Sequence, residues 1–285
     1  ITLNHQKKKK TAPSTDLKFV KGRSGCEGVV LAQGIVIDQL LSDVTHLANF
    51  SGELNEQHFH KAIEESKKQL EQLQKQIEND ILDASGLIFT AQILMLQDTG
   101  FQESILTLIR QGATPPQAII TVVEDYVKKF GALQDSYLRD KIYDVKDIGR
   151  RLLENITGKK DHHHDLKGRI VIASELLPSD TVKLYSQQVK GIILLSGGVT
   201  SHVSILSRSL NIPLIITDES GFLFIPEENQ ILLDAFMGYI YLNPSPDIVK
   251  QVLEREQLNK NIDEHKKSIR GQACTKDGMP IKLMA

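Results

Sequence analysis

The chain has 285 residues and a mass of 31.9 kDa, which is enough for two domains. Hydrophobic residues make up 40% of it and charged residues 25%, so wholesale disorder, collagen-like repeats and a disulfide-stapled scaffold are excluded. The 34 basic and 36 acidic residues leave a net charge of −2, which excludes a global positive field that would attract nucleic acid.

Targeting signals are also missing from the sequence pattern. No apolar run reaches the ~20 residues needed to cross a bilayer, and no apolar stretch follows the lysines at 7–10, as a secretory signal would require. Cys26 and Cys274 lie far apart without CxxC spacing, which fits a reducing compartment. We expect a soluble cytoplasmic protein.

The first part of the chain changes from polar to β-rich and then to helical. Residues 1–24 are polar and without periodicity, which predicts a linker, and the glycine-punctuated stretch 25–37 predicts one or two strands. Apolar residues then recur at three- and four-residue steps, which predicts amphipathic helices near 59–81, 86–96, 102–110, 115–126 and 135–158. Five helices joined by short loops indicate a helical bundle.

Beyond residue 165 the pattern is that of an α/β domain. Strands are expected at 169–173, 191–195 and 212–216, a hairpin at 230–242, and short helices at 181–188 and 202–210. Residues 246–265 predict a charged helix, and the alternating Met279, Ile281 and Leu283 predict the opening of a strand. We also expect 25–37 to pair into the later sheet, because so short a β-rich segment cannot bury its apolar face alone.

One segment, 197–208, carries the chemistry: Gly-Gly-Val-Thr-Ser-His-Val-Ser-Ile-Leu-Ser-Arg. It lies between a predicted buried strand and a helix, with Gly197 and Gly198 permitting a tight turn and Thr200 or Ser201 as the N-cap. His202 then stands in the first turn, where the helix favours a bound anion, and could carry a phosphoryl group. The alternative is a histidine that caps or packs beneath a loop.

This segment resembles the phosphohistidine signature of the phosphoenolpyruvate-utilising enzymes, and among them the chain resembles Enzyme I of the bacterial phosphotransferase system. The resemblance runs from about Gly25 to the end, with further matches at 88–98, 136–156 and 176–181. It implies a swivelling phosphohistidine α/β domain, 25–44 and 166–245, with an inserted helical phosphocarrier-binding domain at 45–165. Residues 246–285 would be a linker helix and the start of a phosphoenolpyruvate-binding barrel.

The resemblance also implies roles for individual residues. His202 would carry the phosphoryl group, Thr181 would hold one ring nitrogen, and Arg208 would neutralise phosphate oxygens; a helix cap and a surface ion pair are the respective alternatives for the last two. Gly197, Gly198, Thr200 and Ser201 would form the loop around the phosphoryl group. The expected phosphocarrier contacts are Gln92, Leu94, Met95, Arg139 and Lys141, although Leu94 and Met95 also suit core packing and the two basic residues an ordinary wet helix face. Three adjacent histidines, 162–164, do not converge on a metal, so we expect a solvated loop there and no metal ligand.

The implied reaction moves a phosphoryl group from phosphoenolpyruvate through His202 to the phosphocarrier protein HPr or its nitrogen-branch counterpart, in sugar transport or nitrogen regulation. A polar leader at 11–17 would suit a nitrogen-branch member with an upstream sensory domain. Phosphoenolpyruvate and Mg²⁺ would belong to the barrel of a longer, homodimeric chain. We therefore expect this chain to be a monomeric fragment without cofactor, competent in exchange with the carrier.

Two other functions remain open at this stage. A fragment of pyruvate phosphate dikinase or phosphoenolpyruvate synthase would share the histidine signature, but the helical insertion and the lack of a glycine-rich nucleotide loop argue against it. A regulatory module that docks a carrier without turnover would not need His202 together with Thr181.

Overall fold

The computed structural model describes residues 19–37, 54–80, 86–158, 165–226 and 229–268. Ile1–Asn243 form one compact unit and Pro244–Ala285 a second. In the second unit the described part is one helix, α9 (Pro246–Ser268). The strand expected at 279–283 lies outside the described residues.

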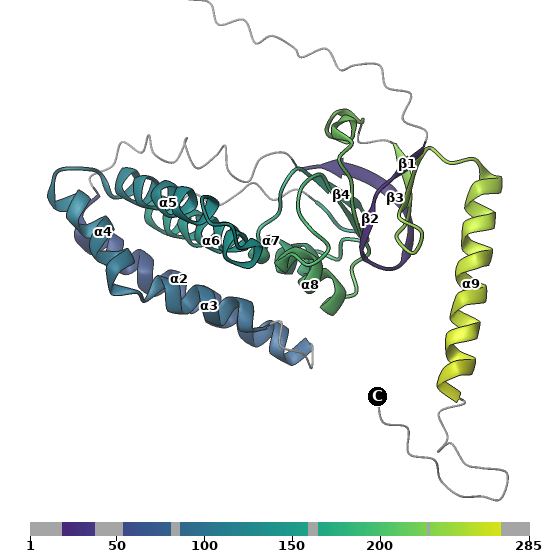
Figure 1. The fold of residues 1–285 in the computed structure, drawn as a ribbon, viewed down its shortest axis with the longest axis horizontal. Helices are drawn as coiled ribbons and strands as arrows, with labels where there is room; N and C mark the ends of the chain where they lie inside the picture. Colours follow the sequence, from purple (N-terminus) through teal and green to yellow (C-terminus); the bar gives the residue numbers. More distant parts are fainter. Residues whose placement is uncertain (1–18, 38–53, 81–85, 159–164, 227–228, 269–285) are drawn as a thin grey trace, which may run out of the picture. The chain divides into compact units, whose positions relative to one another are not determined.

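An eight-stranded mixed sheet organises the α/β part of the first unit (Figure 1). Its strand order is β1-β8-β7-β3-β4-β5-β6-β2, with parallel pairing from β3 through β4 and β5 to β6. The strands are β1 (Phe19–Lys21), β2 (Arg23–Cys26), β3 (Val29–Val36), β4 (Ile170–Ala173), β5 (Gly191–Leu194), β6 (Leu214–Ile216), β7 (Gln230–Asp234) and β8 (Tyr239–Leu242). Because β3 pairs with both β4 and β7, the predicted pairing of 25–37 with the later strands is confirmed.

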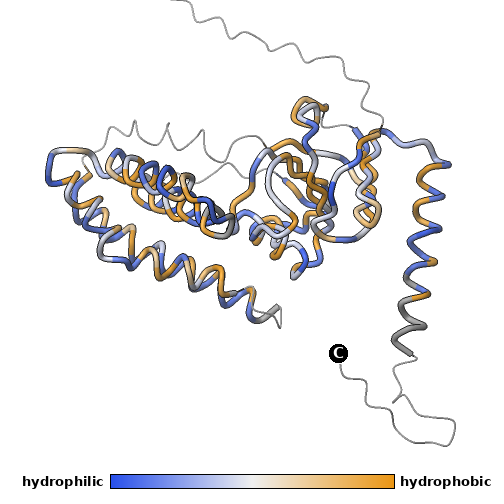
Figure 2. Tube along the Cα trace, viewed as in Figure 1, coloured by the Kyte–Doolittle hydropathy of each residue, from blue (hydrophilic) through white to orange (hydrophobic). Residues whose placement is uncertain are grey.

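Alternate residues of the central strands face two apolar layers, as expected for a sheet that is buried on both faces. Ile170 and Ile172 of β4 pack in one cluster with Phe222 of the short 3₁₀ helix η2 (Ser220–Phe224). Val171 and Ala173 point to the other cluster, which includes residues of α7 (Pro178–Ser186) and α8 (His202–Ser209). Figure 2 shows the strands as mostly hydrophobic, whereas the helices alternate between hydrophobic and hydrophilic residues.

Five described helices lie between β3 and β4 in the sequence, as predicted. They are α2 (Glu56–Asp80), α3 (Leu87–Leu96), α4 (Thr99–Arg110), α5 (Pro115–Gly131) and α6 (Ser136–Thr157). Helix α5 begins at Pro115, where a missing N–H costs nothing, and α4 is capped by Asp98, which accepts from the Phe101 N–H at 2.7 Å. The apolar faces of α2 and α6 pack together, and the buried cluster that they form continues to the α7 and α8 face of the sheet.

The predicted linker at 1–24 is wrong in its last residues. Phe19–Lys21 forms the edge strand β1 against β8, and Arg23–Cys26 forms β2 against β6. The two strands have only three and four residues and lie at the edges of the sheet, where no long apolar run is needed. The division of the first unit into separate helical and α/β domains stays a prediction.

Candidate active site

The loop between β5 and α8 brings His202 to the first position of a helix. Gly197 in this loop has φ +116°, a value that L side chains rarely adopt. A Cβ added at Gly198 would meet nothing closer than atoms of Thr200 at 3.8 Å. The turn therefore requires the first glycine of the predicted phosphate loop and leaves room for a side chain at the second.

Ser201 caps the helix. Its Oγ accepts from the backbone N–H of Ser204 at 3.4 Å, and the Ser204 hydroxyl donates to the Gly198 carbonyl at 2.9 Å. Of the two predicted caps, Ser201 is therefore the cap, and Thr200 is exposed. The first N–H groups of a helix lack partners within it and favour negative charge, so His202 stands at an end suited to an anion.

The imidazole of His202 faces a carboxylate from the inserted helices. Its Nδ1 atom is buried and lies 3.3 Å from Oδ1 of Asp144 on α6, and the described residues give Nδ1 no hydrogen bond of good geometry. The side chain is 13% exposed. Because Nδ1 is buried, this exposure belongs to the rest of the ring, which carries Nε2.

Asp144 is held by two further side chains. Its Oδ2 accepts from Lys141 Nζ at 2.9 Å, and its Oδ1 accepts from Gln92 Nε2 at 3.3 Å. Burial alone would raise the pKa of Asp144, but His202 and Lys141 outweigh burial and lower it. The carboxyl group is therefore ionised near neutral pH.

Thr181 does not hold the histidine. Its side chain is fully buried on α7, and its hydroxyl has no hydrogen-bond partner among the described residues. The predicted hydrogen bond from Thr181 to His202 is thus not formed, and the polar atom facing Nδ1 belongs to Asp144 instead. The sequence resemblance could not reveal this contact, because α6, which carries Asp144, and α8, which begins at His202, are far apart in the chain.

Arg208 binds backbone carbonyl groups of the loop that precedes His202 and of strand β2. Its Nη1 donates to the carbonyl of Gly25 at 2.7 Å and to that of Val199 at 3.0 Å. The guanidinium thus ties the loop before His202 to strand β2, where a phosphate contact or a surface ion pair was expected. A contact between Arg208 and a phosphoryl group stays a prediction.

The predicted partner-binding residues are not one surface. Gln92 is fully buried and donates to Asp144 and Asp147, and Lys141 is bound to Asp144, so both support the site from inside. The side chain of Arg139 lies outside the described residues. Leu94 is 64% exposed, and Met95 is partly buried against the core.

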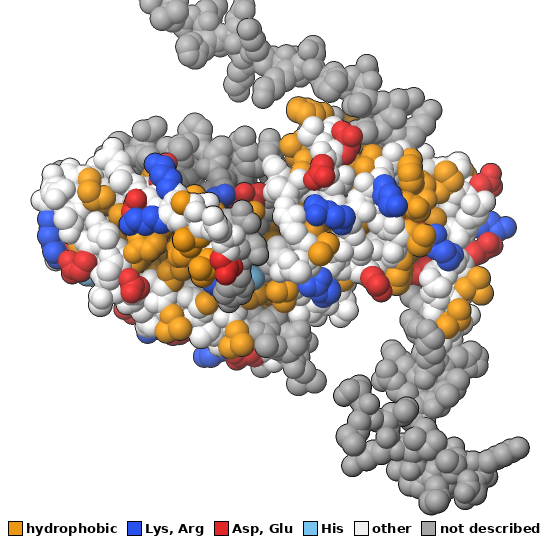
Figure 3. All heavy atoms as spheres, in the orientation of Figure 1, with side chains coloured by type: hydrophobic (Ala, Val, Ile, Leu, Met, Phe, Trp, Pro, Cys, Tyr) orange, Lys and Arg blue, Asp and Glu red, His pale blue; other side chains and the backbone are white. Residues whose placement is uncertain are grey.

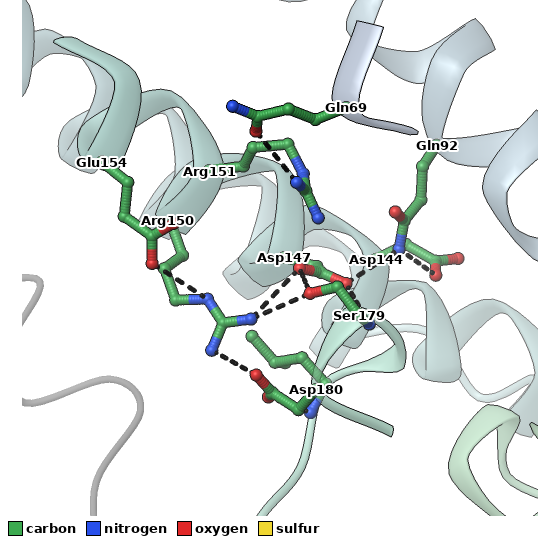
Figure 4. Close-up of polar contacts among 10 residues, drawn as sticks. Gln69, Gln92, Asp144, Asp147, Arg150, Arg151, Glu154, Ser179 and Asp180 are labelled. Atoms are coloured by element: carbon green, nitrogen blue, oxygen red, sulfur yellow. Dashed lines mark hydrogen bonds and ion pairs between the residues drawn. The ribbon is translucent and has the colours of Figure 1, made fainter. Parts of the chain in front are cut away.

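A second polar cluster, which the sequence analysis missed, joins α6 to α7 (Figure 4). Arg150 is buried and points its guanidinium at Ser179 (2.9 Å), Asp180 (2.8 Å) and Asp147 (3.4 Å). Asp147 also accepts from the Ser179 hydroxyl and, at 2.9 Å, from its backbone N–H. Burial would lower the pKa of Arg150, but the surrounding carboxylates raise it, so the arginine stays charged.

A signal for this cluster was present on α6. Lys141, Asp144, Asp147 and Arg150 follow each other at three-residue steps, so that each is a neighbour of the next and the series winds around the helix. The apolar positions of the same helix predicted its core face, and this second, charged stripe marks where α6 meets α3, α7 and His202.

Two hollows border these residues. The one at His202 encloses only about 10 Å³ and is lined mainly by apolar atoms of residues such as Leu176 and Leu194. A cleft of about 320 Å³ lies between α2, α6 and α7, beside Arg150 and Arg151. A reactant at His202 would therefore have to approach from the protein surface.

The described residues contain neither a metal-binding cluster nor a membrane-spanning helix. No group of three or more His, Cys, Asp or Glu side chains among them is arranged to hold a metal ion. No helix in the described ranges is long and apolar enough to span a membrane.

Comparisons with known proteins find relatives that match most of this chain. The relatives are named phosphoenolpyruvate-protein phosphotransferases. That of Staphylococcus carnosus is 27% identical, over 94% of this chain and 48% of its own length. That of Buchnera aphidicola is 31% identical, over 76% of this chain and 38% of its own, and that of Mycoplasma capricolum is 30% identical, over 87% and 45%. The chain thus spans about half the length of the curated relatives that it matches, or less.

Solved structures show the same fold. An Enzyme I protein solved by NMR has a TM-score of 0.58 at 23% identity, covering 84% of this chain and 99% of that one. The N-terminal domain of a nitrogen Enzyme 1 has a TM-score of 0.53 at 19% identity, covering 83% and 99%. The predicted fold class, an α/β domain with an inserted helical bundle, is confirmed.

Two family descriptions match successive parts of the sequence. "PEP-utilising enzyme, N-terminal" matches residues 21–141, and "PEP-utilising enzyme, mobile domain" matches residues 165–238, which include His202. His202 thus lies in the second matched segment, and Asp144 lies between the two segments. The chain belongs to the PEP-utilising enzymes.

Proposed function

We propose that this chain is the phosphohistidine half of a phosphoenolpyruvate-protein phosphotransferase. His202 accepts a phosphoryl group on a ring nitrogen and exchanges it with a histidine of a small phosphocarrier protein of the HPr type. The observation that carries the proposal is the placement of His202: it begins α8 behind a serine cap, one ring nitrogen faces a buried carboxylate, and the rest of the ring reaches the surface.

Charge stabilisation at this place suits phosphoryl transfer. A phosphoryl group on nitrogen carries close to two negative charges, which the N-terminal end of α8 offsets. The hollow at His202 encloses only about 10 Å³, so a donor held outside this hollow, by a partner protein or by another domain, would bring its phosphoryl group to the ring. A protein that presents a phosphohistidine from its own surface meets that requirement.

The inserted helices provide a docking surface for such a carrier. Leu87 and Leu94 of α3 are 63% and 64% exposed, and Met95 lies partly buried beside them. Exposed hydrophobic side chains break the charged surface of the helical part in several places (Figure 3). The five described helices between β3 and β4 also favour a phosphotransferase over a dikinase fragment, which would exchange its phosphoryl group with a nucleotide-binding domain.

The remaining parts of the reaction belong to a longer protein. We assign phosphoenolpyruvate and Mg²⁺ to the barrel whose start the sequence analysis places within 246–285, and the described residues do not fit the metal because no set of candidate ligands among them converges. The longer protein would act as a homodimer in the cytoplasm, in sugar transport or its nitrogen-branch counterpart.

Exchange of a radioactive phosphoryl group tests the proposal. The chain is mixed with ³²P-labelled phosphocarrier, and we expect acid-labile, base-stable label on the parent protein and none on His202→Ala. His60→Ala is the matched control, because His60 is an exposed histidine of α2 with no contact to the site. Label that persists in His202→Ala would refute the proposal.

A further inference from the structure

The carboxylate of Asp144 is held in a fixed orientation by side chains from two helices. Its carboxylate is 1% exposed, with Lys141 on Oδ2 at 2.9 Å and Gln92 on Oδ1 at 3.3 Å. Gln92 comes from a different helix, α3, and is itself fully buried. Two helices thus hold Oδ1 3.3 Å from Nδ1 of His202.

The charge of Asp144 determines whether Nδ1 of the His202 ring donates or accepts a hydrogen bond. His202 and Lys141 lower the pKa of Asp144 against the effect of burial, so the group is an acceptor only. A ring nitrogen that faces an acceptor must carry the proton, and a neutral imidazole has only one. A hydroxyl such as that of Thr181 can donate or accept and would leave the tautomer open.

We infer that Asp144 is a positioning residue that fixes the His202 proton on Nδ1 and so leaves Nε2 as the nucleophile. This inference rests on the proposed function, and it adds a residue to which neither the histidine signature nor the comparisons assign a role. Gln92 and Lys141 act through Asp144, because they hold its two oxygens in place.

The transfer step balances with Asp144 in this role. The lone pair of Nε2 forms the new N–P bond while the P–N bond of the donor phosphohistidine breaks, and that electron pair stays on the donor nitrogen. The His202 ring keeps its proton on Nδ1 and becomes positively charged. The donor ring, protonated on its other nitrogen beforehand, becomes neutral. Asp144 stabilises the charged ring as the carboxylate of a Ser-His-Asp triad does.

Asp144→Asn makes a specific prediction about the tautomer. With Lys141 present, the amide oxygen will turn toward the ammonium group, so the NH₂ will face Nδ1 as a donor. Gln92 can adapt, because its Oε1 has no partner among the described residues. The neutral ring must then accept at Nδ1 and carry its proton on Nε2, which removes the nucleophile.

Long-range ¹H–¹⁵N correlation NMR on the ¹⁵N-histidine-labelled full chain shows directly which tautomer His202 adopts. His202→Ala assigns the His202 signals among the nine histidines. At about pH 8, where imidazoles are neutral, we expect the Nδ1–H tautomer in the parent chain and the Nε2–H tautomer in Asp144→Asn. Asp147→Asn is the matched control: Asp147 is equally buried one turn further along α6 and also binds Gln92, but its hydrogen-bond partners among the described residues include no atom of His202.

Several outcomes would overturn the inference. An Nε2–H tautomer in the parent chain would do so even if Asp144→Asn failed to fold, and so would an Asp144→Asn protein that keeps Nδ1–H. In single-turnover transfer from phosphorylated carrier we expect Asp144→Asn to be slower by about 10²–10⁴-fold, with unchanged carrier affinity and with Asp147→Asn within a few-fold of the parent. A parent chain that shows the Nδ1–H tautomer but accepts no phosphoryl group would refute the proposed function and leave the tautomer result standing.

Discussion

Nδ1 of His202 lies 3.3 Å from Oδ1 of Asp144, and the two residues come from different parts of the fold. His202 begins α8, next to the sheet, whereas Asp144 lies on α6, the last of the helices inserted between β3 and β4. The inserted helices therefore supply part of the histidine's immediate surroundings. A change on α6 should alter the chemistry of His202 without touching the signature segment.

Gly197 and Gly198 should differ sharply when each is replaced by alanine. Gly197→Ala places a side chain at φ +116°, which costs about 1–3 kcal/mol, whereas Gly198→Ala makes only ordinary van der Waals contact with Thr200 and should stay within about 0.5 kcal/mol of the parent. Urea unfolding of both variants measures the difference. Equal stabilities would mean that the turn does not need the first glycine.

The sequence predicted the fold well where the pattern was strong. The periodicity of α2 and α6 and the apolar runs of β4, β5 and β6 indicated their type and approximate bounds, because burial on a helix face or inside a sheet forces a repeating pattern. It failed at β1 and β2, since edge strands such as Phe19–Lys21 need no apolar run.

Leu94 tests the docking surface. Leu94→Asp should leave the unfolding free energy within about 0.5 kcal/mol of the parent, because the side chain is 64% exposed, and should weaken carrier binding measured by calorimetry. Leu258→Asp is the control, since Leu258 is similarly exposed, at 62%, on α9. Carrier affinity that is unchanged by Leu94→Asp, or lowered equally by both variants, would contradict docking at α3.

Arg150 should be among the most sensitive positions for stability. Arg150→Met leaves Asp147 and Asp180 buried without their cation, which costs about 3–5 kcal/mol. Arg151→Met, which loses a bond to Gln69 at the edge of the cleft, should cost about 1 kcal/mol. Denaturant unfolding compares the two, and a smaller loss for Arg150→Met than for Arg151→Met would show that the cluster does not hold α7 to α6.

Asp144 should make stability depend on pH in the acid range. Its pKa in the folded chain lies below the ordinary value of 3.8, so the unfolded chain binds the proton first as pH falls. The stabilisation from its ionised form is therefore complete above about pH 5, and it is lost as pH falls through the ordinary value and then the folded one. The stability difference between the parent and Asp144→Asn should shrink below about pH 4; a difference that grows there would contradict an ionised Asp144.

The site was only half predictable for a physical reason. His202, its glycine turn and its serine cap are contiguous, so the local pattern revealed them. Asp144, Gln92 and Arg150 act across the fold, and their roles depend on which helix faces which. Gln92 and Lys141 were expected on a partner surface because a helix position alone does not tell whether a polar side chain points outward or toward a buried carboxylate.

The central claim is that His202 carries the phosphoryl group, and locating that group by tandem mass spectrometry tests it most directly. The full chain is phosphorylated by a phosphocarrier, digested under alkaline conditions that preserve phosphohistidine, and its histidine-containing peptides are fragmented. We predict that the added phosphate is found on His202 and on none of the other eight histidines. Phosphate on any other residue, with His202 unmodified, would contradict the account.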